Sequence, residues 1–262
     1  MANSENLYLK VAITAARQAG AHILKKIGNF GKISYKGRIN LVTDVDKKSE
    51  KIIDGCIKNI FPDHNILGEE GGYQKTSRNG YKWIIDPLDG TTNFAHSFPM
   101  FCVSIGMEKD NKVMVGAVYD PVRGELFYAQ RGHGAYLNKK RIKVSSISDL
   151  SKSLLVTGFS YNIKEANYTN IDNFRKFLLV SQAVRRTGSA ALDLCYVACA
   201  RFDGFWEVGL HPWDTAAASL IVEEAGGRLT DFKSKPYSHY DKEILASNGI
   251  VHKQMLKIIS KT

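Results

Sequence analysis

The sequence is poor in the features that mark secreted, fibrous and membrane proteins. It has 4 cysteines and 6 prolines in 262 residues, and it contains no internal repeat or low-complexity tract. No stretch is apolar and long enough to span a membrane, and the first residues predict an amphipathic helix rather than a signal peptide. These absences argue against a disulfide scaffold, a repeat protein or a membrane partner. We therefore expect four reduced cysteines and a cytoplasmic location.

Acidic residues are also in deficit. The chain has 36 Lys and Arg against 26 Asp and Glu, which gives a net charge of +10. The basic groups, such as Lys47-Lys48 and Lys139-Lys140-Arg141, are not interleaved with aromatic residues as in single-stranded nucleic-acid sites. A solvated surface that attracts phosphorylated ligands is the first interpretation. Nucleic acid is a possible partner, but no motif supports it. An RNA-associated regulatory protein is therefore kept as the alternative to an enzyme.

The order of predicted elements divides the chain into two lobes. The first, residues 1–150, has two helices and then a strand that leads into an antiparallel meander. In the second, residues 151–262, short strands alternate with helices, which indicates a helix-covered sheet. The expected helices lie near 5–28, 46–60, 170–180, 189–200, 213–225 and at the C-terminus, and the main strands near 82–86, 101–108, 113–119, 125–129, 154–157, 183–185, 203–207, 228–230 and 244–246.

The most informative segment is Trp83-Ile84-Ile85-Asp86-Pro87-Leu88-Asp89-Gly90-Thr91-Thr92-Asn93-Phe94. An apolar run typical of a buried strand meets a proline that cannot continue a β-ladder, so two carboxylates lie where the strand ends. A helix that begins after Gly90 would direct its first N–H groups towards an anion such as phosphate. Taken alone, the pattern also fits a turn and a helix cap without chemistry.

Three further acidic motifs have the same pattern, with a carboxylate at the edge of an apolar segment. They are Leu41–Asp46, in which an acid can cap the helix expected near Asp46, Leu67-Gly68-Glu69-Glu70, and Trp213-Asp214-Thr215-Ala216-Ala217-Ala218. With Arg185–Ala191, all of these motifs resemble, in order, those of the inositol monophosphatase family of magnesium-dependent, lithium-inhibited phosphatases. The resemblance covers nearly the whole chain. It implies an α+β fold, an α-β-α-β-α layered sandwich of the sugar-phosphatase type, with the active site between two sheets.

The resemblance also implies a metal site. Glu69, Asp86 and the Leu88 carbonyl would hold one ion, and Asp86, Asp89 and Asp214 a second. Ligands that are all oxygen favour a hard cation, so we expect two or three Mg²⁺ per site, with Mn²⁺ as a substitute. Neighbouring carboxylates about 4 Å apart repel by roughly 4 kcal/mol at an effective dielectric of 20, so such a cluster needs a cation or protons.

Catalytic roles follow from the same resemblance. Glu69 and the Thr91 hydroxyl would orient a water for in-line attack, with Asp44 as the proton acceptor for Thr91. Asp89 and the N–H groups of Gly90 and Thr91 would contact the phosphate, while Glu207 and the backbone of Ala190 would contact the hydroxyls of the substrate.

Several neighbouring residues have simpler interpretations. Glu70 is expected to be solvated or outside the metal shell, and His96 and His211 structural, because a hard-cation site has little use for imidazole. For Glu207 the alternative is a surface strand residue. The expected activity is hydrolysis of inositol 1-phosphate by a homodimer. Fructose 1,6-bisphosphate or 3'-phosphoadenosine 5'-phosphate is the alternative substrate within the same superfamily.

Overall fold

The structure is a computed structural model that describes residues 2–28, 33–35, 41–78, 80–160, 163 and 169–260. Two helices, α1 (Ala2–Leu24) and α2 (Asp44–Ile60), lie side by side and form the outer layer of the first half. They are helices because apolar residues recur every three or four positions, which gives each an apolar face. In α1 this face includes Ala12, Ala15 and Ala19, all fully buried.

The larger sheet has eight strands in the order β10-β9-β8-β7-β6-β5-β3-β4. Its bounds are β3 (Asn65–Gly68), β4 (Gly72–Gln74), β5 (Tyr81–Asp89), β6 (Cys102–Lys109), β7 (Lys112–Asp120), β8 (Glu125–Gln130), β9 (Ala135–Leu137) and β10 (Lys140–Ile142). The predicted meander is confirmed, because β6, β7 and β8 pair antiparallel in sequence order. Among the described strands of this sheet, β3 and β5 form the one parallel pair. A separate antiparallel pair joins β1 (Ile33–Tyr35) to β2 (Leu41–Thr43).

The smaller sheet has five strands in the order β12-β11-β13-β15-β14. The strands are β11 (Leu154–Thr157), β12 (Ala183–Arg185), β13 (Gly204–Val208), β14 (Arg228–Thr230) and β15 (Glu243–Ser247). The helices of this half are α4 (Ile171–Leu178), α5 (Ala190–Ala198), α6 (Pro212–Glu224) and α7 (His252–Ile259). A short helix, α3 (Thr91–Ala95), and a 3₁₀ turn (Leu150–Lys152) complete the elements.

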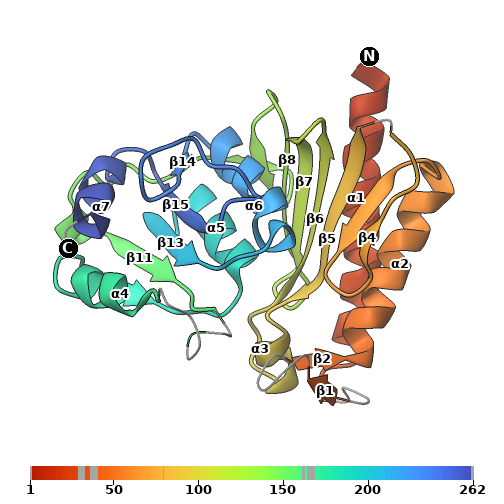
Figure 1. The fold of residues 1–262 in the computed structure, drawn as a ribbon, viewed down its shortest axis with the longest axis horizontal. Helices are drawn as coiled ribbons and strands as arrows, with labels where there is room; N and C mark the ends of the chain where they lie inside the picture. Colours follow the sequence, from red (N-terminus) through yellow and green to blue (C-terminus); the bar gives the residue numbers. More distant parts are fainter. Residues whose placement is uncertain are drawn as a thin grey trace.

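The elements stack in five layers, as predicted. Helices α1 and α2 cover the outer face of the larger sheet, α5 and α6 lie between the two sheets, and α4 and α7 cover the far side of the smaller one (Figure 1). Because α5 and α6 have a sheet on either side, they are apolar all round: every residue of α5 is buried. No described helix is long and apolar enough to cross a membrane.

Helix α6 lies close to the larger sheet because two glycines make room for it. A Cβ on Gly116 of β7 would lie 2.5 Å from the Ala217 carbonyl oxygen, and one on Gly106 of β6 would lie 3.2 Å from the Ala217 nitrogen. A side chain at either position would push the helix outward. The strands of the larger sheet end by Ile142, and those of the smaller sheet begin at Leu154. Helix α6 packs against strands of both sheets. The division of the chain into residues 1–150 and 151–262 therefore stays a prediction.

Candidate active site

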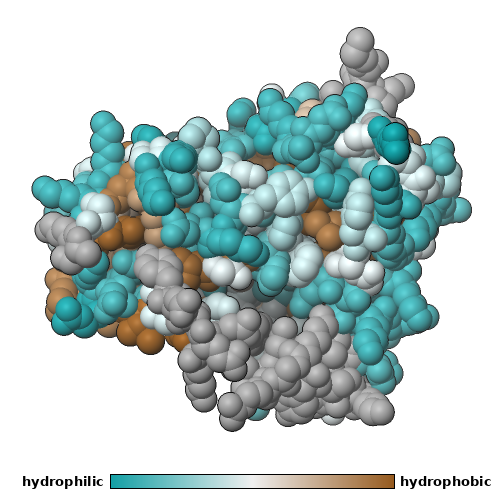
Figure 2. Space-filling model, in the orientation of Figure 1, coloured by the Kyte–Doolittle hydropathy of each residue, from teal (hydrophilic) through white to brown (hydrophobic). Residues whose placement is uncertain are grey.

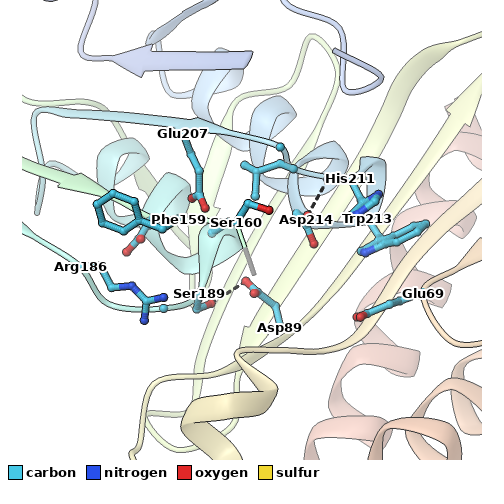
Figure 3. A pocket seen from close by; sticks show the side chains of 16 residues that line it. Glu69, Asp89, Phe159, Ser160, Arg186, Ser189, Glu207, His211, Trp213 and Asp214 are labelled. Carbon is cyan, nitrogen blue, oxygen red and sulfur yellow. Dashed lines mark hydrogen bonds between the residues drawn. The ribbon is translucent and has the colours of Figure 1, made fainter. Parts of the chain in front are cut away.

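A cavity of about 320 Å³ lies between the two sheets and is open to solvent (Figure 3). Its wall from the larger sheet carries Glu69 and Asp89, and the start of α6 contributes Asp214. The opposite wall carries Glu207 from β13 and Arg186, which follows β12. The remaining lining residues are Gly158, Phe159, Ser160, Gly188, Ser189, Ala190, Asp193, Gly209, Leu210, His211 and Trp213.

Strand β5 carries two carboxylates, of which Asp89 lines this cavity and Asp86 is buried behind it. Its pairing with β6 shifts register between Asp86 and Asp89, where Pro87 interrupts the ladder as predicted. Asp86 is 2% exposed, and its Oδ1 accepts a 2.9 Å hydrogen bond from the Leu88 N–H. Asp89 Oδ2 accepts from the Ser189 hydroxyl at 2.6 Å and from the Ala191 N–H at 2.8 Å. The two acids are therefore held from different sides.

Glu69 lies in the turn between β3 and β4, and a residue of α2 holds that turn. The Glu50 carboxylate accepts hydrogen bonds from the N–H groups of Glu70 (2.9 Å) and Gly71 (2.6 Å). Gly68 leaves room for this carboxylate, because a Cβ there would lie 2.5 Å from Glu50 Oε2 and the Glu50 side chain would have to move. Glu70 takes part through its backbone in this contact and does not line the cavity.

Asp214 is the third residue of α6. Its Oδ2 accepts a 2.7 Å hydrogen bond from the His211 N–H, which forms a capping box at the helix start. The His211 ring stacks on Trp213 at 4.7 Å, and both rings border the cavity. His96 is exposed beyond α3. Asp214 thus caps its helix and faces Asp89 of β5 at the same time (Figure 3).

These carboxylates oppose one another's ionisation. Burial raises the pKa of Asp86 well above its usual value, and the charges of Glu69, Asp89 and Asp214 raise it further. Burial likewise raises the pKa of Asp89 to about 6, although its hydrogen bonds from Ser189 and the backbone work in the opposite direction. The pKa of Asp214 is also well above normal, because of burial and then the charge of Asp89.

The donor set fits a hard cation. Within the described residues, no three His, Cys, Asp or Glu side chains already lie close enough together to hold a metal ion. The acids nevertheless lie near enough to raise one another's pKa. A site of mutually repelling oxygen ligands suits a hard cation such as Mg²⁺ or Mn²⁺.

One catalytic prediction needs correction. The Thr91 hydroxyl donates to Asp46 Oδ1 at 3.0 Å and lies 3.0 Å from the Leu88 carbonyl oxygen, so its carboxylate acceptor is Asp46 and not Asp44. Helix α2 begins at Asp44, not near Asp46 as expected. Asp46 therefore lies on the buried face, 1% exposed, while Asp44 is exposed at the helix start.

Gly90 shapes the turn between β5 and α3. It adopts φ +95°, and a Cβ there would lie 2.8 Å from the Met100 carbonyl oxygen, so no other residue fits without a shift. Helix α3 begins directly after it, as the sequence predicted, and Thr91 is its first residue. The N–H groups of this turn are therefore placed beside the carboxylates of β5.

Glu207 is not a surface residue of its strand. It is 5% exposed, and burial followed by the charges of Asp193, Asp214 and Asp89 raises its pKa well above normal. A Cβ on Gly158 would lie 2.3 Å from the Glu207 carboxylate, so the glycine leaves room for it. The Ala190 N–H lies at the start of α5 and is bonded towards Asp89, and Ala190 also borders the cavity.

Sequence reasoning missed several residues of the site. Asp46 and Glu50 are buried one helical turn apart on α2, where buried acids on an apolar face are a signal of polar contacts. Arg186 and Ser189 lie within the Arg185–Ala191 motif, but no role was predicted for them, and Asp193 lies just outside that motif; all three reach the cavity through the fold. Ser189 also caps α5, and Asp193 bonds the Thr187 hydroxyl.

Known proteins resemble this chain over nearly all of its length. The sequence model of the Inositol monophosphatase family matches residues 5–262. The Inositol-1-monophosphatase of Synechocystis sp. is 46% identical over 256 residues, which cover 97% of this chain and 89% of that protein. The Nus factor SuhB of Vibrio cholerae is 49% identical over 226 residues, 86% of this chain and 85% of that protein. The structure of inositol monophosphatase from Anabaena superposes with a TM-score of 0.90 at 43% identity and covers 98% of this chain and 96% of its own.

Proposed function

The chain belongs to the inositol monophosphatase family and is a phosphoric monoester hydrolase, and from that premise we propose that it hydrolyses inositol 1-phosphate and similar small polyol phosphates with Mg²⁺. The observation that supports this best is the environment of Asp86, a buried acid whose ionisation is opposed by three neighbouring acids in the wall of an open cavity. Such a cluster fits a cation-assisted reaction on an anionic substrate.

In this proposal, Glu69, Asp86 and the Leu88 carbonyl would hold one Mg²⁺, and Asp86, Asp89 and Asp214 would hold a second. When bound, Mg²⁺ supplies Lewis acidity: it makes a water more acidic and withdraws electron density from the phosphoryl group. Each remaining contribution belongs to a residue of the chain.

Glu69 and Thr91 position the attacking water. The Thr91 hydroxyl donates to Asp46, so its oxygen is left to accept a hydrogen bond from the water, and Glu69 receives the proton that the water loses. The water oxygen forms a bond to phosphorus while the ester P–O bond breaks, and the leaving alkoxide takes up a proton. The N–H groups of Gly90 and Thr91 hold the phosphoryl oxygens, and no covalent enzyme intermediate is required.

Glu207 and Ala190 form the part of the site that recognises the polyol. Glu207 faces the cavity from β13, opposite the carboxylates of β5 (Figure 3). A carboxylate there can accept hydrogen bonds from neighbouring hydroxyls of a ring. Burial and then the charges of nearby acids raise its pKa, and hydrogen bonds from substrate hydroxyls would stabilise the carboxylate.

The proposal is tested by phosphate release from inositol 1-phosphate before and after treatment with EDTA, with Mg²⁺ added back. Activity should vanish with EDTA and return with Mg²⁺ or, at a different level, with Mn²⁺. Full activity in EDTA would overturn the metal assignment. Millimolar Li⁺ should inhibit uncompetitively if it replaces the second Mg²⁺ while phosphate is still bound.

Arg186 gives a specific reason to test the rival substrates. Its guanidinium lines the same cavity on the side of Glu207, where it can meet a second phosphate. Fructose 1,6-bisphosphate and 3'-phosphoadenosine 5'-phosphate both carry one. A comparison of kcat/KM for these compounds and inositol 1-phosphate decides between them, and we expect inositol 1-phosphate to give the highest value.

A second candidate function, RNA-associated regulation, is favoured by the similarity to proteins named Nus factor SuhB and by the net charge of +10. Figure 2 shows that hydrophilic residues cover most of one face, while hydrophobic residues gather near the end that carries α4 and α7. The affinity for RNA, measured at a series of salt concentrations, distinguishes a regulatory role from non-specific attraction. Binding that survives physiological salt supports the regulatory role, and loss below ~200 mM salt indicates non-specific attraction.

Oligomeric state and location remain predictions. A homodimer should give twice the monomer mass of 29.2 kDa in solution, which light scattering measures directly. The cysteines Cys56, Cys102, Cys195 and Cys199 are unpaired, as a reducing cytoplasm would require, although Cys56 and Cys199 are only half-buried.

A further inference from the structure

The segment between β14 and β15, residues 231–242, joins the active-site end of α6 to the distant end of the larger sheet. It begins with a tight turn in which Asp231 Oδ1 accepts from the N–H groups of Lys233 (2.9 Å) and Lys235 (2.7 Å). It ends where the Lys242 carbonyl accepts from the Gly209 N–H at 2.7 Å, just before α6. We name residues 236–242 the strap.

The first contact of the strap is with the helix that carries Asp214. The Tyr237 hydroxyl donates to the Thr215 hydroxyl at 2.9 Å, and Thr215 is fully buried in the first turn of α6, next to Asp214. The Lys242 side chain reaches the Leu210 carbonyl oxygen at 3.3 Å. The strap therefore touches the residues before and after the start of α6.

The second contact is an anchor in the larger sheet. Glu108 of β6 is 1% exposed, and it accepts hydrogen bonds from His239 at 2.7 Å and Tyr240 at 2.9 Å, both in the strap. Lys82 of β5 adds a 2.6 Å ion pair. Burial alone would raise the pKa of Glu108, but these three donors outweigh it and lower that pKa to about 2. A carboxylate with three donors is a firm attachment point.

Alternate residues of β6 share one face, and that face meets α6 and the strap in succession. The Ser104 hydroxyl lies 3.4 Å from the Trp213 carbonyl oxygen, Gly106 makes room for the backbone of α6, and Glu108 receives the strap. Ser104 is also the cross-strand neighbour of Asp86. This face of β6 therefore determines the position of Asp214 relative to Asp86, and the strap stabilises the contact between β6 and α6.

We propose that Tyr237 is a positioning residue, and that the strap, anchored at Glu108, holds the first turn of α6 so that Asp214 can share a cation with Asp86 and Asp89. The inference rests on the proposed cation site. The partners that orient a metal ligand typically change metal affinity 10- to 100-fold when they are removed. The strap supplies such an orientation without touching substrate or metal.

The test uses Tyr237→Phe, which removes only the hydroxyl, and Tyr136→Phe as a matched control. Tyr136 also donates through its hydroxyl, to the His133 carbonyl oxygen at 3.2 Å, far from the cavity. Two quantities are measured for each variant: the Kd for Mg²⁺ by calorimetric titration, and the Mg²⁺ concentration that gives half-maximal activity. Tyr237→Phe should raise the Kd and this concentration about tenfold each, while kcat at saturating Mg²⁺ stays within about threefold of the parent.

The reciprocal variant Thr215→Val removes the other half of the contact. The double variant with Tyr237→Phe should bind Mg²⁺ no more weakly than the weaker single variant, because both changes break the same hydrogen bond. A Mg²⁺ affinity of Tyr237→Phe within about twofold of the parent, with only a lower Tm, would overturn the positioning role. A parent that neither binds Mg²⁺ nor hydrolyses phosphate esters would instead overturn the proposed function, and the strap's role with it.

Discussion

At the scale of single residues, charge repulsion dominates the site. Asp214 should be indispensable for turnover yet unfavourable for the metal-free protein, because its pKa is raised by burial and by neighbouring acids. We expect Asp214→Asn to lower kcat at saturating Mg²⁺ by more than 100-fold. A loss of less than about tenfold, or about 1.4 kcal/mol, would leave Asp214 as a helix cap only.

The same variant has a stability signature in EDTA. An acid whose folded pKa lies above its unfolded value stabilises the fold below the unfolded pKa, and that contribution is lost as pH rises through the folded pKa. Asp214→Asn should therefore match or exceed the parent's Tm at pH 7 in EDTA, and this advantage should vanish near pH 4. Asp172→Asn, which changes an exposed acid in the first turn of α4, provides the control for helix-end effects.

Glu207 should determine selectivity rather than metal binding. We expect Glu207→Gln to lower kcat/KM on inositol 1-phosphate by roughly ten- to a hundred-fold, because a hydrogen bond to a charged group is worth about 1.5–3 kcal/mol. Hydrolysis of a phosphate ester without nearby hydroxyls should change little. Equal losses on both substrates would assign Glu207 to the metal site or the fold. Glu243→Gln on the neighbouring strand, outside the cavity, is the matched control.

The sequence motif did not predict whether Asp44 or Asp46 accepts the hydrogen bond from Thr91. Both acids lie in one motif, and two residues along a helix differ by about 200° in direction. Only the true start of α2, at Asp44, decides which acid faces Thr91. Motifs therefore predicted which segments carry acids, whereas the partner of each acid depends on helix phase and on distant residues such as Ser189.

At the scale of elements, the contact between α6 and the larger sheet tolerates no added atoms. Gly116→Ala would place a Cβ 2.5 Å from the Ala217 carbonyl oxygen, so the helix must move. We expect a loss of about 1–3 kcal/mol, a Tm lower by roughly 2–4 °C per kcal/mol, and weaker Mg²⁺ binding because α6 carries Asp214. Gly55→Ala in α2, where nothing lies within 4 Å, should instead raise the Tm slightly. An unchanged Tm for Gly116→Ala would contradict this account of the packing.

Helix α7 is joined to the smaller sheet by a neutral histidine. His252 is fully buried, with Thr230 of β14 at 3.0 Å from Nε2 and Ser247 of β15 at 2.9 Å from Nδ1. Thr230 donates to the Asp231 carbonyl, so it accepts from Nε2–H, and Ser247 donates to Nδ1. Burial, and then the charge of Arg228, lowers the pKa of His252 to about 4.

This lowered pKa predicts acid sensitivity of the smaller sheet. Between pH 6.5 and about 4 the unfolded chain takes up a proton on His252 that the folded chain refuses, so stability falls as pH falls through that window. Denaturant unfolding of the parent and of His252→Gln at pH 7 and pH 4.5 measures the effect. The variant should lose less stability between the two values, and His133→Gln, at an exposed site, should behave as the parent does. Equal losses in all three would contradict the assignment.

Element length decided how much of the fold could be predicted. Helices of 8 residues or more and strands such as β6 and β7 show their periodicity, and the predicted meander and the alternating second half are confirmed. Strands β3, β4, β9 and β10 have 3 or 4 residues each and were not predicted, whereas the equally short β11, β12 and β14 were predicted because helices alternate with them. The two-sheet arrangement itself came from the family resemblance, because periodicity does not specify which faces pack together.

At the scale of the whole molecule, a cation held by β5 and α6 would tie the larger sheet to the middle helix layer. A ligand that binds only the folded state stabilises it by about 2.7 kcal/mol at a concentration of 100 Kd. We therefore expect saturating Mg²⁺ to raise the Tm by roughly 5–10 °C over the EDTA-treated protein. Calorimetry at matched ionic strength with K⁺ in place of Mg²⁺ is the control, and an equal Tm in both salts would contradict a bridging cation.

The placement of α6 between the sheets also has a consequence for synthesis. Translation completes the eight strands of the larger sheet by Ile142, but the helix that covers their inner face is residues 212–224, so about 80 further residues must be made before that helix is complete. During that interval α6 does not cover the sheet face beside Gly106 and Gly116, and this face is exposed to solvent or to chaperones. A ribosome stalled before residue 212 would therefore hold a nascent chain unable to reach its native state, and the larger sheet is covered only after the rest of the chain has been made.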